Sequence, residues 1–74
     1  MIDNQVVRHI AQKIRNTRIK KKLTLHELAT RMNVSKGLLS KIENHHTIPS
    51  LPVFVTLVQS MEISLKDFFE DLEN

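Results

Sequence analysis

The chain has 74 residues, a net charge of +3 and 41% hydrophobic residues, which allows one small domain (residues 1–74) with its own core. It contains no cysteine, which excludes disulfides and thiolate zinc sites and fits a reducing compartment. The longest apolar stretch, residues 51–58, is too short to span a membrane. Residues 1–4 lack the features of a signal peptide. We therefore expect a cytoplasmic protein.

Charge is unevenly distributed along the chain. Residues 1–48 hold ten Lys or Arg and three acidic residues, a net charge of +7, whereas residues 49–74 hold one Lys and five acidic residues, a net charge of −4. A basic half beside an acidic half is expected of a surface that binds a polyanion. A solvated charged face is the alternative, and the asymmetry alone does not decide between the two.

The first helix is predicted over residues 5–21, because apolar side chains recur on one face. That face consists of Val6, Ile10, Ile14 and Thr17. Three lysines at residues 20–22 fall in the last turn, where positive charge complements the helix dipole. Contact with phosphate would explain this run equally well, and the two roles are compatible.

The stretch from Thr24 to Asn44 predicts two short helices joined by a tight turn. Thr24 and Glu27 have the spacing of a capping box, in which each side chain satisfies a backbone N–H at the helix start. Asn33 readily takes the left-handed conformation that ends a helix, and Ser35 is expected to cap the second helix. Two such helices form a helix-turn-helix unit, whose second helix can enter the DNA major groove. An ordinary helical hairpin is the alternative.

Two further helices are predicted in the second half of the chain. Ser50 caps the first, with Pro52 in its first turn, a favoured position for proline. Ser64 begins a shorter one. The apolar residues of these helices are Leu51, Phe54, Val55, Leu57, Val58, Met61, Leu65, Phe68, Phe69 and Leu72. Together the elements predict an all-α, compact five-helix bundle that contains a helix-turn-helix unit at about residues 24–44.

The sequence resembles the Xre/Cro-type helix-turn-helix family of bacterial and phage transcriptional regulators from about Ile10 to Phe69. The matching segments are Ile10, Ile14 and Arg18, then LTLHELATRMNVSKGLLSKIEN, Pro49-Ser50 and MEISLKDFF. Any one of these segments would be a weak signal, but their combination at these separations is specific.

This resemblance implies that the helix over residues 36–43 lies in the major groove. The residues implied to contact bases are Lys36, Gly37, Leu38, Ser40 and Lys41. Those implied to contact phosphates are Arg15, Arg18, Lys22, Thr24, Ser35, Asn44, His45 and His46. Arg18 and Glu43 match an ion pair that locks the first helix of the family to the recognition helix. A lysine can donate to guanine O6 and N7, or hold a phosphate, and Leu38 suits either a thymine methyl or the core.

Three departures from the family pattern stand out. Leu25 occupies a position where many members carry a Gln that grips phosphate, so that contact is expected to be missing. Gly37 costs about 0.5–1 kcal/mol inside a helix relative to Ala and offers no side chain for readout, which favours recognition of DNA shape. Lys22 and His45 stand where members often have Gly at helix ends; both can adopt other terminations, and neither departure undermines the fold.

The leading hypothesis is a sequence-specific double-stranded DNA-binding transcriptional regulator, a repressor that binds a symmetric operator as a homodimer. Phe69 and Leu72 are candidates for the dimer interface, or they complete the core. The alternative is an antitoxin or protein-interaction module of the same fold, with a protein partner such as a toxin. We expect no enzyme activity, no cofactor and no metal site, because catalytic motifs and metal-ligand spacings are missing. RNA binding is disfavoured, since the chain has three Phe and no Tyr or Trp for base stacking.

Overall fold

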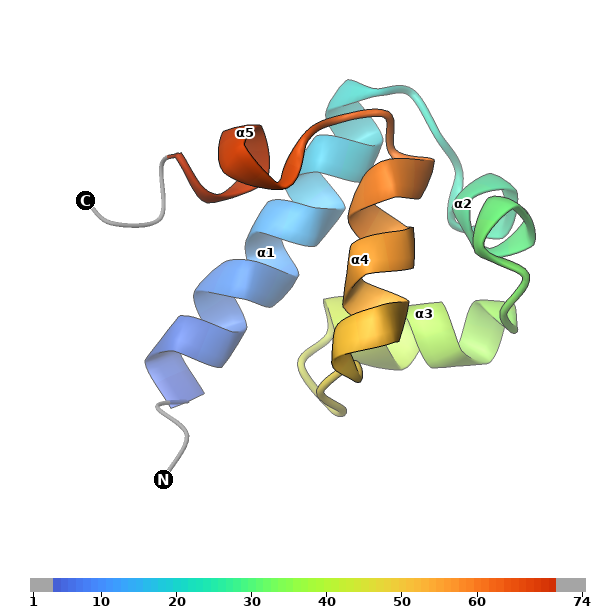
Figure 1. Cartoon of the computed structure of the whole chain (residues 1–74). Helices are drawn as coiled ribbons and strands as arrows, with labels where there is room; N and C mark the ends of the chain where they lie inside the picture. Colours follow the sequence, from blue (N-terminus) through green and yellow to red (C-terminus); the bar gives the residue numbers. More distant parts are fainter. Residues whose placement is uncertain (1–3, 71–74) are drawn as a thin grey trace.

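The computed structural model describes residues 4–70 and, within them, consists of five α-helices and no strands (Figure 1), which confirms the predicted all-α class. The first helix begins and ends one residue earlier than predicted. No helix in this part of the chain combines the length and the hydrophobicity that crossing a bilayer requires. The extent of the domain over residues 1–74 stays a prediction. The helices are α1 (Asn4–Lys20), α2 (Leu25–Met32), α3 (Lys36–Glu43), α4 (Leu51–Ser60) and α5 (Leu65–Phe69).

Each of the last four helices begins after a Ser or Thr that caps it, as the sequence indicates. The hydroxyls of Thr24, Ser35, Ser50 and Ser64 accept a hydrogen bond from the backbone N–H three residues later, at 3.0, 3.0, 3.3 and 3.0 Å. The Thr24 N–H also donates to Glu27 Oε1 at 2.8 Å, which completes the predicted capping box. This backbone hydrogen bond is the main cause that holds the pKa of Glu27 below its ordinary value.

Each of the first four helices is followed, within two residues of its end, by a residue in the left-handed region of backbone space. Lys22, Asn33, His45 and Glu62 have φ values of 60°, 58°, 49° and 60°. Asn33 was expected there, whereas Lys22 and His45 take the left-handed conformation of the family's Gly rather than another termination. The reason is hydrogen bonding: each left-handed residue donates its N–H to a carbonyl of the preceding turn, as Lys22 does to Ile19 O at 2.9 Å. These bonds satisfy backbone groups that the helix end leaves unpaired.

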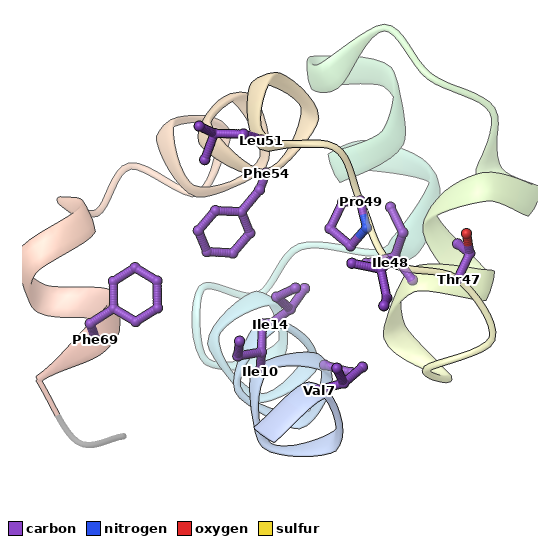
Figure 2. Close-up of a pocket in the computed structure, with 11 residues that line it drawn as sticks. Val7, Ile10, Ile14, Thr47, Ile48, Pro49, Leu51, Phe54 and Phe69 are labelled. Carbon is purple, nitrogen blue, oxygen red and sulfur yellow. The ribbon is translucent and has the colours of Figure 1, made fainter. Parts of the chain in front are cut away.

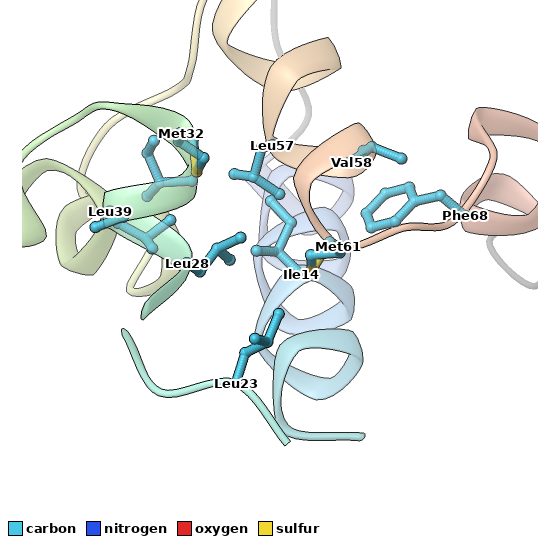
Figure 3. Close-up of a cluster of buried hydrophobic side chains, with 11 residues drawn as sticks. Ile14, Leu23, Leu28, Met32, Leu39, Leu57, Val58, Met61 and Phe68 are labelled. Carbon is cyan, nitrogen blue, oxygen red and sulfur yellow. The ribbon is translucent and has the colours of Figure 1, made fainter. Parts of the chain in front are cut away.

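The core lies where α2 packs against α3 and α4, α1 packs against α3, and α4 packs against α5 (Figure 3). Every one of these helices contributes at least one fully buried side chain, so the five helices share a single core. The largest fully buried side chains are Phe68, Ile14, Leu28, Leu39, Ile42, Leu57, Met61 and Val58.

Several apolar residues of the predicted faces are exposed instead. Val6 is 51% exposed, because the N-terminal turns of α1 extend away from the other helices (Figure 1). Leu51 is 73% exposed at the first position of α4, and Leu65 and Phe69 of α5 are 39% and 42% exposed. Helix α4 is therefore not buried all around. It turns one face toward the core, whereas its N-terminal end borders a groove described below.

Candidate nucleic-acid interface

Helix α3 turns one face to the core and the other to solvent. Leu39 and Ile42 are buried, with 0% and 2% of their surface exposed, and they fix the rotation of the helix about its axis. Lys36, Gly37 and Lys41 are exposed. Three of the five residues implied to contact bases therefore lie on the solvent side of α3.

The other two implied base-contact residues are only partly accessible. Leu38 is half-buried and packs against the core cluster. Ser40 is also half-buried, and its carbonyl and hydroxyl oxygens lie 2.8 and 3.4 Å from Asn44 Nδ2, which donates to them. This contact ties the side chain of Asn44 to the last turn of α3.

An ion pair holds the C-terminal end of α3 to α1. Arg18 Nε donates to Glu43 Oε2 at 2.7 Å, and Nη2 donates to Oε1 at 3.1 Å, the bidentate geometry that suits a guanidinium and a carboxylate. Arg18 Nη1 donates to Leu23 O at 2.9 Å, so the same side chain also fixes the link to α2. The Arg18 side chain is only 13% exposed. In the structure this side chain ties α3 to α1, and its contact with phosphate stays a prediction.

A hollow of about 310 Å³ opens beside this ion pair, between α1 and α3. Arg15 and Asn44, both exposed and both implied to contact phosphate, line this hollow together with Ser40. Leu25 also lines the hollow, so an apolar side chain occupies the position where the resemblance implies a Gln.

The remaining implied phosphate contacts are spread over the links around α2. Lys22 and Thr24 are exposed between α1 and α2, and Ser35 is exposed in the turn before α3. The Thr24 and Ser35 hydroxyls accept capping hydrogen bonds, which leaves each O–H available as a donor.

His45 and His46 line a second hollow, of about 340 Å³, together with Val7 and Arg8 of α1. Sequence reasoning did not single out Arg8. A signal was present, because Arg8 precedes Arg15 by seven residues, a spacing that puts two side chains on nearly the same face of a helix.

A third hollow, the apolar groove, has a volume of about 330 Å³ and runs between α1, the loop after α3, α4 and α5 (Figure 2). Ile48, Leu51 and Phe69 are its most exposed residues, at 55%, 73% and 42%. Ile48 and Leu51 were not anticipated as surface residues. Leu72, the other candidate for a dimer interface, lies outside the described residues. The groove is lined by Val7, Ile10, Ala11, Ile14, Ile42, Thr47, Ile48, Pro49, Leu51, Phe54 and Phe69.

Within residues 4–70, no three His, Asp or Glu side chains come together as a group that could hold a metal ion. The stacked rings of His45 and His46 do not form part of such a group. Their centroids lie 6.2 Å apart with an interplanar angle of 8°.

Comparison with known proteins shows which family this chain belongs to. The HTH_3 helix-turn-helix family, which is DNA-binding and non-catalytic, matches residues 14–68, a segment that includes α2, the turn, α3 and the Arg18–Glu43 ion pair. No curated protein matches the chain. The family match covers most of the chain and coincides closely with the predicted extent of the resemblance. The chain therefore belongs to the Xre/Cro-type HTH_3 family of helix-turn-helix DNA-binding domains.

Proposed function

We propose that the chain is a sequence-specific regulator of transcription, a repressor whose α3 enters the major groove of a symmetric operator. The main observation in support of the proposal is that the position and the orientation of α3 are fixed within the fold. Its start is capped by Ser35, its inner face is buried, and its end is clamped by the pair of Arg18 and Glu43. A recognition helix that is ordered before binding loses little further conformational entropy on DNA.

The exposed side of α3 supplies the proposed readout. Lys36 and Lys41 extend from it as flexible cations able to donate to guanine O6 and N7, and Gly37 between them allows the helix backbone to approach the DNA. Arg15 and Asn44 border α3 and contact phosphates in this proposal. Phosphate contacts supply most of the affinity, whereas contacts along α3 supply sequence preference.

We further propose that two copies of the chain associate through the apolar groove. The exposed fractions of Ile48, Leu51 and Phe69 support this, since solvent-exposed apolar surface gathered in one place marks an interaction site. The groove adjoins the loop after α3. A two-fold axis that passes near it and points toward the DNA would present both recognition helices to the same side of the duplex. Two such helices would enter successive major grooves about 34 Å apart.

The first test is the binding of a fluorescein-labelled, mixed-sequence duplex, followed by anisotropy across a salt series. We expect log K to fall linearly with log salt concentration. Selection of the preferred site should then change for Lys36→Ala and Lys41→Ala but not for Lys66→Ala, which removes the same charge from α5. If wild type fails to bind even at about 50 mM salt, the proposal is wrong.

Self-association is tested separately by light scattering. Leu51→Glu should make the protein monomeric and weaken its binding to a symmetric site. Leu65→Glu, a matched change outside the groove, should leave both unchanged. A wild-type protein that stays monomeric with and without DNA would refute the homodimer. The groove would then favour the alternative function, an antitoxin or interaction module that binds a different protein.

A further inference from the structure

The hollow between the N-terminal half of α1 and the loop after α3 has the composition of an anion site. Its four lining residues are Val7, Arg8, His45 and His46, none of which is acidic. Arg8 is exposed and, among residues 4–70, has no carboxylate partner, in contrast to Arg18. A guanidinium that no carboxylate neutralises retains its N–H donors for a ligand.

The loop supplies the opposite wall in a fixed form. His45 takes a left-handed backbone conformation and its Nδ1 contacts the carbonyl oxygen of Asn44, which orients the ring. The His46 ring stacks on it, with a centroid separation of 6.2 Å that lies within the range of favourable aromatic pairs. His46 is exposed and lines the hollow, so its imidazole is accessible there and is supported by the ring of His45.

This hollow, lined by Arg8 and His46, continues the surface of the hollow that is lined by Arg15 and Asn44. Arg8 and Arg15 are seven residues apart on α1, which places them on nearly the same side and about 10 Å apart along the axis. On the facing wall, Asn44 of the hollow beside Arg15 is followed directly by His45 and His46. The two hollows therefore form consecutive steps along one edge of the molecule. Measured along the axis of the DNA helix, one strand carries about three phosphates over such a distance.

We propose that Arg8 and His46 form a second clamp for a backbone phosphate, one step beyond the contacts of Arg15 and Asn44. This inference rests on the proposed function and extends its footprint along α1. The ligand is a phosphodiester of the operator DNA, held by charge and hydrogen bonds without reading a base. The clamp therefore adds affinity equally on preferred and on mixed-sequence DNA.

The expected effect follows from counterion release. Loss of one phosphate contact lowers the magnitude of the salt slope by about 0.9. Arg8→Ala should therefore bind a mixed-sequence duplex about eightfold more weakly than wild type at 0.1 M salt, with the difference vanishing toward 1 M. His46→Ala should also weaken binding, because it removes a hydrogen-bond donor to the phosphate. Neither variant should alter which site is selected, in contrast to Lys41→Ala.

Lys66→Ala is the matched control, because it removes one positive charge from α5 in the acidic half. Circular dichroism melting of each variant shows that the fold is retained, as expected for exposed side chains. A slope unchanged in Arg8→Ala, while wild type binds DNA, overturns the clamp and leaves the proposed function standing. An equal loss in Lys66→Ala also overturns it, since net charge would explain the effect. Absence of wild-type binding overturns both proposals.

Discussion

Gly37 combines a local cost to the fold with a proposed role on DNA, and Gly37→Ala should separate the two. A Cβ built at this position meets only Ser35 Oγ, at 4.0 Å, and the backbone angle is an ordinary helical one. The added methyl is therefore free of strain. Because position 37 lies in the first turn of α3, we take the lower end of the range for Gly to Ala, about 0.5 kcal/mol of added stability. The melting temperature should rise by about 2–4 °C.

The effect on DNA binding should have the opposite sign. If the backbone at Gly37 approaches the DNA closely, the methyl group enters a packed contact, which costs about 1–3 kcal/mol. That cost corresponds to roughly 5- to 150-fold weaker binding. Thermal melting by circular dichroism measures the first effect, and fluorescence anisotropy measures the second.

Gln59→Ala is the control for this comparison, because it is exposed in the last turns of α4, far from α3 (Figure 1). It should raise helix propensity slightly and leave DNA affinity unchanged. A Gly37→Ala protein that is more stable and binds DNA as well as wild type would refute the close approach of α3. A less stable Gly37→Ala protein would refute the packing argument itself.

Three further predictions concern the helix ends and the ion pair. Glu43→Ala should lower the free energy of unfolding, measured in urea, by about 3–5 kcal/mol, because it leaves a largely buried guanidinium without its partner. Glu62→Ala, which breaks the exposed pair with Arg31, should lower it by about 1 kcal/mol or less. His45→Gly should raise the melting temperature by relieving a left-handed backbone, worth about 1 kcal/mol, whereas Asn33→Gly should change it less. The pKa of Glu27 is lowered in the fold, so the carboxylate stabilises the protein above its ordinary pKa of 4.5. The stability lost in Glu27→Gln, measured by urea unfolding between pH 7 and pH 3, should therefore shrink as the pH falls below that value.

The helix starts could be predicted from sequence because their signals are local. A Ser or Thr placed before an apolar-periodic segment satisfies an N–H three residues on, whatever the rest of the chain does. All four predicted caps carry this hydrogen bond. The pairing of Arg18 with Glu43 is different. It joins residues far apart in sequence, and only the resemblance to the family pointed to it.

The exposed apolar residues could not be predicted from periodicity. Leu51 lies on an apolar helix, but whether another element covers it depends on how α5 and the loop after α3 pack around α4. The same holds for Val6, which continues the apolar face of α1 beyond the point where other helices cover it. Periodicity identifies a face that can be buried, whereas tertiary packing decides how much of it is.

The left-handed helix ends escaped prediction for a different reason. Sequence rules associate this conformation with Gly and Asn, so the residue types at Lys22, His45 and Glu62 gave no signal. Only the resemblance pointed to Lys22 and His45, because family members often have Gly there. In the fold, the hydrogen bonds that close each helix end outweigh the steric cost of a side chain there. For His45 the side chain also has a use in the proposed phosphate clamp, because its ring supports that of His46.

The way α3 is held bears on how it would recognise DNA. The backbone of α3 is fixed by a cap at one end and by the bidentate pair of Glu43 with Arg18 at the other. The residues that it exposes, in contrast, are two flexible lysines and a glycine. A lysine contributes a point charge and lacks the planar fork that reads guanine bidentately. In the proposed function, discrimination between sites would then depend on how well groove width and backbone path fit a rigid helix flanked by the proposed phosphate contacts. Gly37, which would let that helix approach closely, is accordingly a position, beside Lys36 and Lys41, where a small change should alter site selection.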